Sequence, residues 1–183
     1  MLLSETPVGS MNYNVLRNLL KQGGVVQIGR GAEIGVLSAD TSSYLLAEFP
    51  NLTLTCVDPW LAYNQHEPER TAEHMSHQEK VARQKLSIFG DRAQIIKDYS
   101  VNGSKHVADN SLDFVFIDAL HTYEAVTEDI TAWYPKVRSG GLFAGHDYHW
   151  EGVQKAVEEF SIKNAIRGFC TPISSDIWFF VKP

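Results

Sequence analysis

The chain has 183 residues, of which 44% are hydrophobic and 21% charged, with a formal net charge of −6. We expect a single globular domain over residues 1–183, and the negative charge argues against nucleic acid or an anionic membrane as the main partner. The chain has no basic, apolar leader and no run of 18 apolar residues, so we expect a cytoplasmic protein.

Short β-type runs alternate with helix-type periods, which predicts a mostly parallel sheet with helices on both faces. The first helix is marked by Leu16, Leu19 and Leu20. Later helices are expected from about 41, over 71–89 and 123–137, and around 153–160. The expected strands are 25–36, 52–57, 93–97, 112–117, 142–145, 167–172 and 177–182.

The last two expected strands are joined by a link at 174–176, which suits an antiparallel hairpin and excludes a crossover helix. The sequence therefore predicts an α/β fold with a Rossmann-like, doubly wound sheet of seven strands. Most strands would be parallel, and the sheet would close with the C-terminal hairpin. Ser139, Gly140 and Gly141 are expected to form the turn that leads into the strand at 142–145.

Two glycine frames compete for a ligand-binding loop: a GxGxxxG pattern over Gly29–Gly35, and a second frame over Glu33–Thr41. A loop that binds a ligand in this way must be followed at once by a helix N-terminus. Good N-cap residues over 38–42 follow Gly35, whereas more strand follows Gly29. This favours the second frame, although a glycine turn of this kind can also be only a tight turn.

Two acidic residues support a nucleoside site. Asp58 ends the second expected strand, and an acidic residue about 20 positions past a glycine turn commonly binds ribose hydroxyls. The alternative for Asp58 is a cap or turn before Pro59. Glu33 suits a cationic group such as an amino acid's ammonium and would repel a pyrophosphate. The GxGxxG of NAD enzymes is absent, which disfavours a nicotinamide-dependent oxidoreductase.

Six motifs occur in a specific order: Glu33 to Val36, Val57 to Trp60, Phe116 to Asp118, His121 to Glu124, Asp129, and Gly140 to Tyr148. Together they resemble class I S-adenosylmethionine-dependent methyltransferases over about residues 25–160. The subgroup is the one with macrocin-type O-methyltransferases and cephalosporin-hydroxylase-like proteins. The likeness to catechol O-methyltransferases is more distant.

The resemblance implies S-adenosylmethionine as the cofactor. Glu33, Gly35 and Thr41 would hold its methionine part, and Ser100 would lie by the adenine. The full set of implied cofactor-binding residues is Glu33, Gly35, Thr41, Asp58, Trp60, Ser100 and Asp118. The family usually has a second glycine where this chain has Ala39, whose methyl group is expected to narrow the loop.

A possible metal site follows from the strand ends. Asp118 ends the fourth expected strand and His146 and Asp147 end the fifth, so the three side chains should meet at one rim. Such a set suits a divalent cation: the carboxylates favour magnesium, and the imidazole favours manganese, iron or zinc. The alternative is that Asp118 caps the following helix and His146 bonds locally.

His121 lies three residues past Asp118, where the catechol-type pattern has its base, and an imidazole with a pKa of about 6.5 accepts protons near neutral pH. An orienting histidine is the alternative. We therefore expect methyl transfer to an oxygen of a sugar, a phenol or a polar metabolite, with His121 and Asp118 as catalytic residues. A cofactor-binding sensor or accessory protein is the alternative function, and a homo-oligomer is compatible with the sequence.

Overall fold

The computed structural model describes residues 8–22, 29–63, 70–171 and 176–183. The helices are α1 (Val8–Gln22), α2 (Asp40–Glu48), α3 (Ala72–Ser87), α4 (Ser100–Ser104), α5 (Tyr123–Trp133) and α6 (Glu151–Lys163), with 3-10 turns η1 (Gly90–Arg92) and η2 (Tyr134–Lys136). The strands are β1 (Arg30–Ile34), β2 (Thr53–Val57), β3 (Ala93–Ile96), β4 (Leu112–Ile117), β5 (Val137–Gly145) and β6 (Trp178–Val181). Among these described elements, no helix has the length and apolar character needed to cross a membrane.

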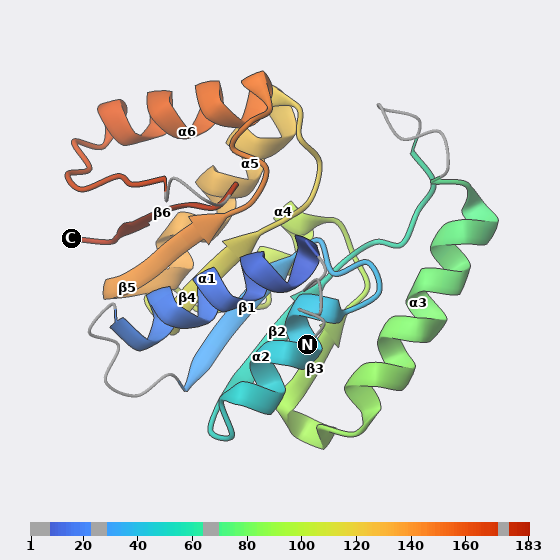
Figure 1. The fold of residues 1–183 in the computed structure, drawn as a ribbon. Coiled ribbons are helices and arrows are strands. Elements are labelled where there is room, and N and C mark those ends of the chain that lie inside the picture. The colour runs from blue at the N-terminus through green and yellow to red at the C-terminus, as the bar shows by residue number, and fades with distance from the viewer. Residues whose placement is uncertain (1–7, 23–28, 64–69, 172–175) are drawn as a thin grey trace, which may run out of the picture.

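The strands form one sheet in the order β3-β2-β1-β4-β5-β6 (Figure 1). β1 to β5 are parallel and β6 is antiparallel to β5, which confirms the expected doubly wound α/β fold. The expected number of seven strands is wrong, because six are present in the described residues. In the segment expected as the strand 167–172, only Cys170 forms a bridge, to Phe179, and the left-handed φ of +82° at Gly168 interrupts extended backbone there. Position 172 and the link residues 174 and 175 lie outside the described residues.

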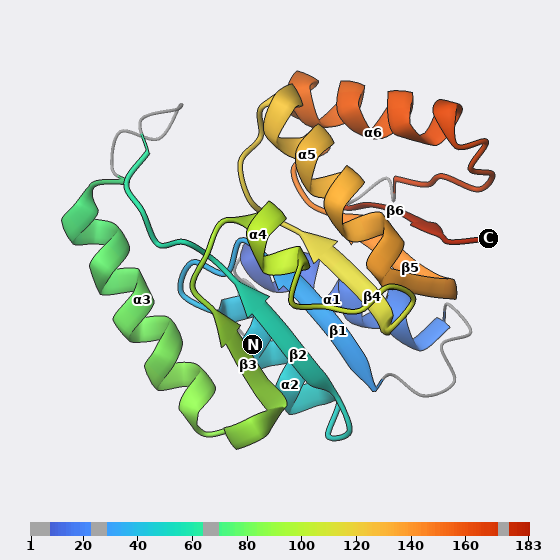
Figure 2. The same cartoon turned by 180° about the vertical axis from the view of Figure 1, so that it is seen from behind.

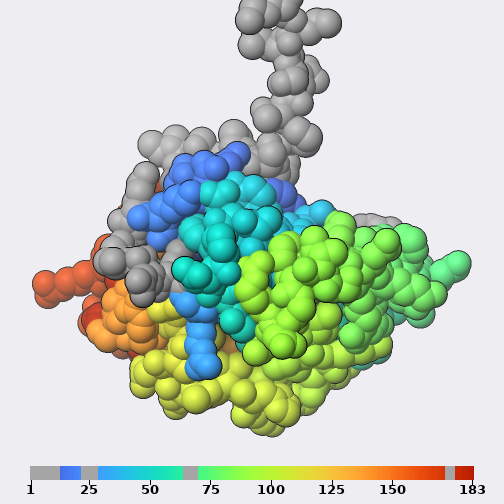
Figure 3. Space-filling view, turned by 90° about the horizontal axis from the view of Figure 1, so that it is seen from below, coloured from blue at the N-terminus to red at the C-terminus, as the bar shows by residue number. Residues whose placement is uncertain are grey.

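Two hydrophobic cores lie on the two faces of the sheet, because side chains alternate along each strand. Helices α1, α2 and α3 cover one face, with Leu20, Leu45 and Leu86 among the buried residues. Helices α5 and α6 cover the other face, which Figure 2 shows in front, with Ile130, Trp133 and Val157 buried there. In the view from below, α2 and α3 lie side by side (Figure 3).

The strand order places a topological switch between β1 and β4, since the chain leaves these two neighbours toward opposite edges of the sheet. Ligands in open α/β sheets bind at such a point, outside the carboxyl ends of the strands. Backbone hydrogen bonds join the ends here: Gly35 N donates to Val57 O at 2.9 Å and Asp118 N donates to Ile34 O at 2.7 Å. The segments that follow β1, β2 and β4 therefore begin side by side.

β5 is longer than expected, and Ser139, Gly140 and Gly141 lie inside it rather than in a turn before it. Gly140 has a φ of +74°, and the pairing of β4 with β5 is irregular between Leu112 and Phe114. From residue 142 onward the register is regular, and His146 N donates to Ile117 O at 2.9 Å. This register brings the end of β5 beside Asp118.

Candidate active site

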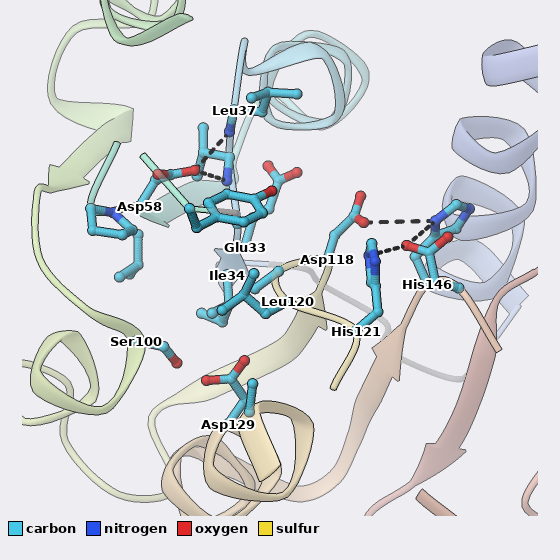
Figure 4. Close-up of a pocket in the computed structure, with 18 of the residues that line it drawn as sticks. Glu33, Ile34, Leu37, Asp58, Ser100, Asp118, Leu120, His121, Asp129 and His146 are labelled. Carbon is cyan, nitrogen blue, oxygen red and sulfur yellow. Dashed lines mark hydrogen bonds and ion pairs between the residues drawn. The ribbon is translucent and has the colours of Figure 1, made fainter. Parts of the chain in front are cut away.

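A cavity of about 780 Å³ opens at the carboxyl ends of β1, β2, β4 and β5 (Figure 4). Its size lies within the usual range for small-molecule sites. Most residues expected to bind a ligand contribute to its wall: Glu33, Gly35, Thr41, Asp58, Ser100, Asp118, His121, His146 and Asp147. Trp60 is the exception, because it is not among the lining residues and is 4% exposed.

Glu33 is a buried carboxyl at the end of β1, on the face of the sheet that α2 covers. The Ser42 hydroxyl donates to its carboxylate, and Thr41 also hydrogen-bonds it. Burial raises the pKa of Glu33 to about 8, and the hydrogen bond from Ser42 opposes this rise only in part. A cationic ligand group would stabilise the ionised carboxylate, so the site suits a positive charge.

The loop after β1 has an unusual backbone. Gly35 has a φ of +87°, and a Cβ there would lie 2.1 Å from the carbonyl oxygen of Asp118. Only glycine fits this position without a shift of the neighbouring backbone. Because the loop begins at Gly35 and α2 follows at once, the frame over Glu33–Thr41 forms the ligand-facing loop. Gly31 instead lies within β1, against Phe114.

Ala39 lies in this loop in the left-handed conformation, with a φ of +61°, which accounts for the glycine usual in the family at this point. Its methyl group packs in the hydrophobic core with Leu45 and Leu46 and is fully buried. Ala39 is not among the residues that line the cavity. The expectation that this methyl group narrows the loop is therefore not met.

Asp58 fastens the loop to the end of β2. Its Oδ2 accepts hydrogen bonds from the backbone N–H groups of Val36 and Leu37, both at 2.9 Å, and its Oδ1 accepts from Trp60 N at 2.7 Å. Trp60 Nε1 donates to Leu37 O at 2.8 Å. Leu37 and Trp60 both have a positive φ, so these bonds hold two strained residues in place.

Ser100 and Asp129 lie together at one end of the cavity, away from Glu33 and the histidines (Figure 4). Ser100 begins α4, and its Oγ accepts a hydrogen bond from Trp133 Nε1 at 2.9 Å. Asp129 projects from α5 and is 5% exposed. Burial raises its pKa to about 6, against the effect of a hydrogen bond from Ser100.

The opposite rim gathers four ionisable side chains from the ends of β4 and β5. His121 Nε2 lies 2.7 Å from Asp147 Oδ2, and His146 Nδ1 lies 3.1 Å from the same oxygen. His146 Nδ1 is also 3.7 Å from Asp118 Oδ1. The His121 ring stacks on Trp150, with ring centroids 5.5 Å apart. The expected meeting of Asp118, His146 and Asp147 at one rim thus occurs, and His121 joins them.

Burial and the neighbouring charges change the pKa values of the side chains at this rim. Burial raises the pKa of Asp118 to about 6, and the charge of His146 acts in the opposite sense. Burial also acts to raise the pKa of Asp147, but hydrogen bonds from His121 and His146 hold it well below its usual range. The pKa of His146 is raised, because its bond to Asp147 and the charge of Asp118 outweigh desolvation. Asp147 is therefore ionised at neutral pH, with both imidazole rings beside its Oδ2.

The donor atoms at the rim fit a divalent cation. One donor atom each from Asp118, His121 and Asp147 lies within 4.8 Å of the other two. Two carboxylates with imidazole nitrogen are a ligand set for metals such as manganese, iron or zinc, and the carboxylates alone suit magnesium. This group contains His121 in place of the expected His146, which lies against both carboxylates.

Tyr13 and Asp129 are two of the cavity residues that escaped the sequence interpretation. Tyr13 of α1 lines the cavity, hydrogen-bonds Thr41 and stacks on Tyr44; nothing in its sequence context indicates such a role. Asp129 was part of a motif but had no assigned role. Its signal was its place on the apolar face of α5, beside Val126 and Ile130, where an unpaired carboxylate would be costly.

The fold and the cavity together define a class: a Rossmann-like α/β protein with a small-molecule cavity at its switch point. A family profile described as "Methyltransferase domain" matches residues 32–148, which is more than half of the chain. The chain belongs to this methyltransferase family, and the resemblance derived from the motifs is confirmed. A search of curated protein sequences finds no match.

Solved structures show the same fold. The O-methyltransferase NovP has a TM-score of 0.71 and 16% identity, over 93% of this chain and 79% of NovP. The calicheamicin methyltransferase CalS11 has a TM-score of 0.71 and 13% identity, over 94% of this chain and 79% of its own. The N-methyltransferase NodS from Bradyrhizobium japonicum WM9 has a TM-score of 0.63 and 16% identity, over 99% of each chain. At these identities the likeness concerns the fold.

Proposed function

We propose that residues 1–183 form one cofactor-binding domain that transfers the methyl group of S-adenosylmethionine to an oxygen of a small-molecule acceptor. Family membership supports methyl transfer. The observation that best supports S-adenosylmethionine as the cofactor is the buried Glu33 beside the Gly35 loop. A sulfonium amino acid carries positive charge, which such a carboxyl would attract. The O-methyltransferases NovP and CalS11 among the similar structures support an oxygen acceptor.

For the cofactor, we assign the methionine part to Glu33, Gly35 and Thr41, with Asp118 beside the sulfonium. The ribose belongs beside Asp58, whose carboxylate has about four acceptor positions and uses three for backbone N–H groups. One position is left for a ribose hydroxyl. The adenine belongs at the end with Ser100. Trp60 then acts through the loop that it braces, since its indole bonds Leu37.

For the chemistry, we assign His121 as the general base. Its Nε2 is close to Asp147, and this contact orients the imidazole and stabilises the imidazolium that forms. Nδ1 then accepts the proton of the acceptor hydroxyl. The stacked Trp150 restricts rotation of the ring. Holding hydroxyl and sulfonium in line removes much of the entropic barrier to transfer.

We assign a divalent cation, magnesium or manganese, to Asp118, His146 and Asp147. A cation bound there would lower the pKa of an acceptor hydroxyl. The side chains themselves fix the position of that hydroxyl between the two carboxylates and the base. Asp118→Asn and Asp147→Asn should each abolish manganese binding, measured by electron paramagnetic resonance, while the affinity for S-adenosylhomocysteine stays largely intact.

The deciding experiment starts with calorimetry of the purified protein against S-adenosylhomocysteine and NADH. We expect 1:1 binding of S-adenosylhomocysteine and a raised Tm; binding of NADH alone would end the methyltransferase proposal. A panel of sugar, phenol and other hydroxyl acceptors, with Mg²⁺, Mn²⁺ or a chelator, then tests transfer. Tight cofactor binding without turnover across a broad panel would favour a sensor or accessory protein.

A further inference from the structure

A groove lies outside the active-site cavity, at the end of α6. It has a volume of about 420 Å³, and its lining includes Glu158, Ser161, Ile162, Ile166, Arg167 and Phe169. None of these residues lines the active-site cavity. In Figure 1, the end of α6 and the segment after it lie on the β6 side of the molecule. This α6 groove is therefore separate from the site described above.

A sharp reversal of the chain forms the α6 groove. The helix ends at Lys163, and Ile166 N then donates to Ser161 O at 2.9 Å. Ala165 has a φ of +51°, in the left-handed conformation that commonly ends helices. The chain then leads to Phe169, which packs with Ile166 against the core on the α6 side of the sheet. The segment after the helix thus lines one side of the groove, and α6 lines the other.

Ile162 protrudes from this part of α6. It is 80% exposed, although apolar neighbours line the groove beside it. Ser161, at the preceding position, is buried, and its Oγ is shielded from solvent. This hydroxyl therefore offers a small polar ligand no reachable hydrogen-bonding atom. The groove suits an apolar side chain of another protein surface, because such a contact would also remove Ile162 from water.

The charged residues of the groove have opposite signs. Glu158 lies one turn before Ile162 on α6, Arg167 lies beyond the end of the helix, and both are exposed. Glu158 Oε1 accepts from Tyr148 Oη at 2.7 Å and from Gln154 Nε2 at 3.2 Å, and neither bond uses Oε2. An acidic and a basic residue that flank a protruding apolar residue make a surface complementary to itself. A twofold interface between identical chains requires such a surface.

We propose that a second copy of this chain binds at the α6 groove, with the two α6 helices antiparallel and the twofold axis close to Ile162. Each Ile162 enters the groove of the other protomer and packs against the partner's Ile166 and the partner's Phe169. The twofold axis places the turn of α6 before Ile162 against the segment after α6 of the partner. Glu158 Oε2 thus pairs with the partner's Arg167, and this pair forms twice. The inference concerns assembly and does not depend on the proposed function.

The first test measures the oligomeric state of the full chain by sedimentation equilibrium, from micromolar to millimolar concentration. We expect a monomer–dimer equilibrium in the wild-type protein. Ile162→Asp places a carboxylate in the apolar contact and should raise the dissociation constant roughly tenfold or more, as for loss of a central anchor. Ile88→Asp is the control, because Ile88 is 79% exposed and lies outside the groove. It should dimerise like the wild type.

The charge pairs allow a sharper test. A Glu158→Lys homodimer would bring together two pairs of positive charges, and an Arg167→Glu homodimer two pairs of negative charges. Each variant alone should therefore be monomeric at concentrations where the wild type is dimeric. In an equal mixture, heterodimers would have opposite charges in both pairs, so the mixture should recover dimers. Since Glu158→Lys also loses the bond from Tyr148, this recovery would exclude damage to the fold as the reason for its monomeric state.

The outcomes that would overturn the proposal are distinct. A wild-type protein that stays monomeric at millimolar concentration would refute the dimer. A dimer that Ile162→Asp leaves intact would refute the α6 groove as its interface, and so would a mixture of the two charge variants that stays monomeric while each has a Tm near that of the wild type. None of these outcomes bears on methyl transfer, and failure of the cofactor titration would leave the dimer standing.

Discussion

The cavity has two ends whose polar groups are held in different ways. At the cofactor end, acidic side chains bond fixed partners: Asp58 takes three backbone N–H groups and Glu33 takes the Ser42 hydroxyl. At the rim, His121 and His146 each pair with the same oxygen of Asp147. Substitutions at the first end should therefore change stability and affinity, whereas substitutions at the rim should change the chemistry and spare the fold.

The largest effect is expected at the rim. His121→Ala removes the assigned base, and the transfer rate should fall roughly 10²–10⁴-fold, the range for loss of a general base. The affinity for S-adenosylhomocysteine and the Tm should stay near wild-type values. Single-turnover assays and calorimetry measure these quantities. His106→Ala, which changes an exposed histidine outside the cavity, is the matched control.

The same variant also distinguishes the two ways in which His121 could serve at the rim. If His121→Ala still binds manganese and has lost the rate, His121 is the base and His146 completes the metal site. Loss of manganese together with the rate would instead make His121 a metal ligand, as its position with Asp118 and Asp147 allows. A wild-type rate would refute both assignments.

At the cofactor end, Gly35→Ala should cost stability. A methyl group would meet the backbone of Asp118 at 2.1 Å, and the φ of +87° adds conformational strain. We expect a loss of roughly 1–3 kcal/mol in the free energy of unfolding, together with weaker cofactor binding. Gly90→Ala is the control, because Gly90 also has a positive φ but no atom lies within 4 Å of a Cβ there. Equal losses in the two variants, by urea unfolding, would contradict the steric argument.

Asp58→Ala should destabilise the protein even without ligand, because it leaves the N–H groups of Val36, Leu37 and Trp60 without their acceptor. The expected loss is about 1–3 kcal/mol of unfolding free energy, with a comparable loss in cofactor affinity. Urea unfolding of the ligand-free protein is the measurement. Reduced cofactor affinity at unchanged ligand-free stability would make Asp58 a ribose ligand alone and not a brace for the loop.

The two ends also differ in how well they could be predicted. A hydrophobic run identifies β4, and a glycine followed at once by a helix identifies the Gly35 loop. The expected N-cap residues do not cap α2, because its N-cap is Ala39, which forms no side-chain cap hydrogen bond. The parallel order of the strands then brings Asp118, His146 and Asp147 to one rim. Which imidazole nitrogen faces which carboxylate depends on side-chain rotamers and on the register of β5, which no local pattern reports.

Other features depend on contacts between distant segments. The brace at Asp58 joins the ends of β1 and β2, and its bonds to Val36 and Leu37 have no signature at the sequence of Asp58. Asp129 could have been found, since a carboxylate on the apolar face of a helix requires a buried partner. The expected seventh strand is an element that the local pattern predicts and the structure does not form. Apolar residues around 169 suggest a strand, but pairing with β6 is limited to Cys170.

The most gradual expected effect is a pH dependence of the free energy of unfolding that comes from Glu33. Its pKa is raised to about 8 in the folded protein by burial, above the ordinary 4.5, so between these values the folded state binds a proton that the unfolded state does not. This contribution is complete below about pH 4.5 and is lost as the pH rises toward 8, with a slope of at most about 1.4 kcal/mol per pH unit. The ligand-free protein should thus lose stability between pH 6 and 8. Glu33→Gln should flatten that part of the curve of stability against pH. Other titrating groups are present in both proteins and cancel in the difference between the two curves.

With S-adenosylhomocysteine bound, the ligand's ammonium group favours the ionised carboxylate of Glu33. The affinity of the wild-type protein should therefore rise from pH 6 to 8, and that of Glu33→Gln should not. Urea unfolding measures the stability curves and calorimetry measures the affinity curves. Parallel curves for the two proteins would mean that Glu33 is not protonated in the ligand-free site. Glu33 would then be ionised in the free protein, as a carboxylate with all its partners in place would be.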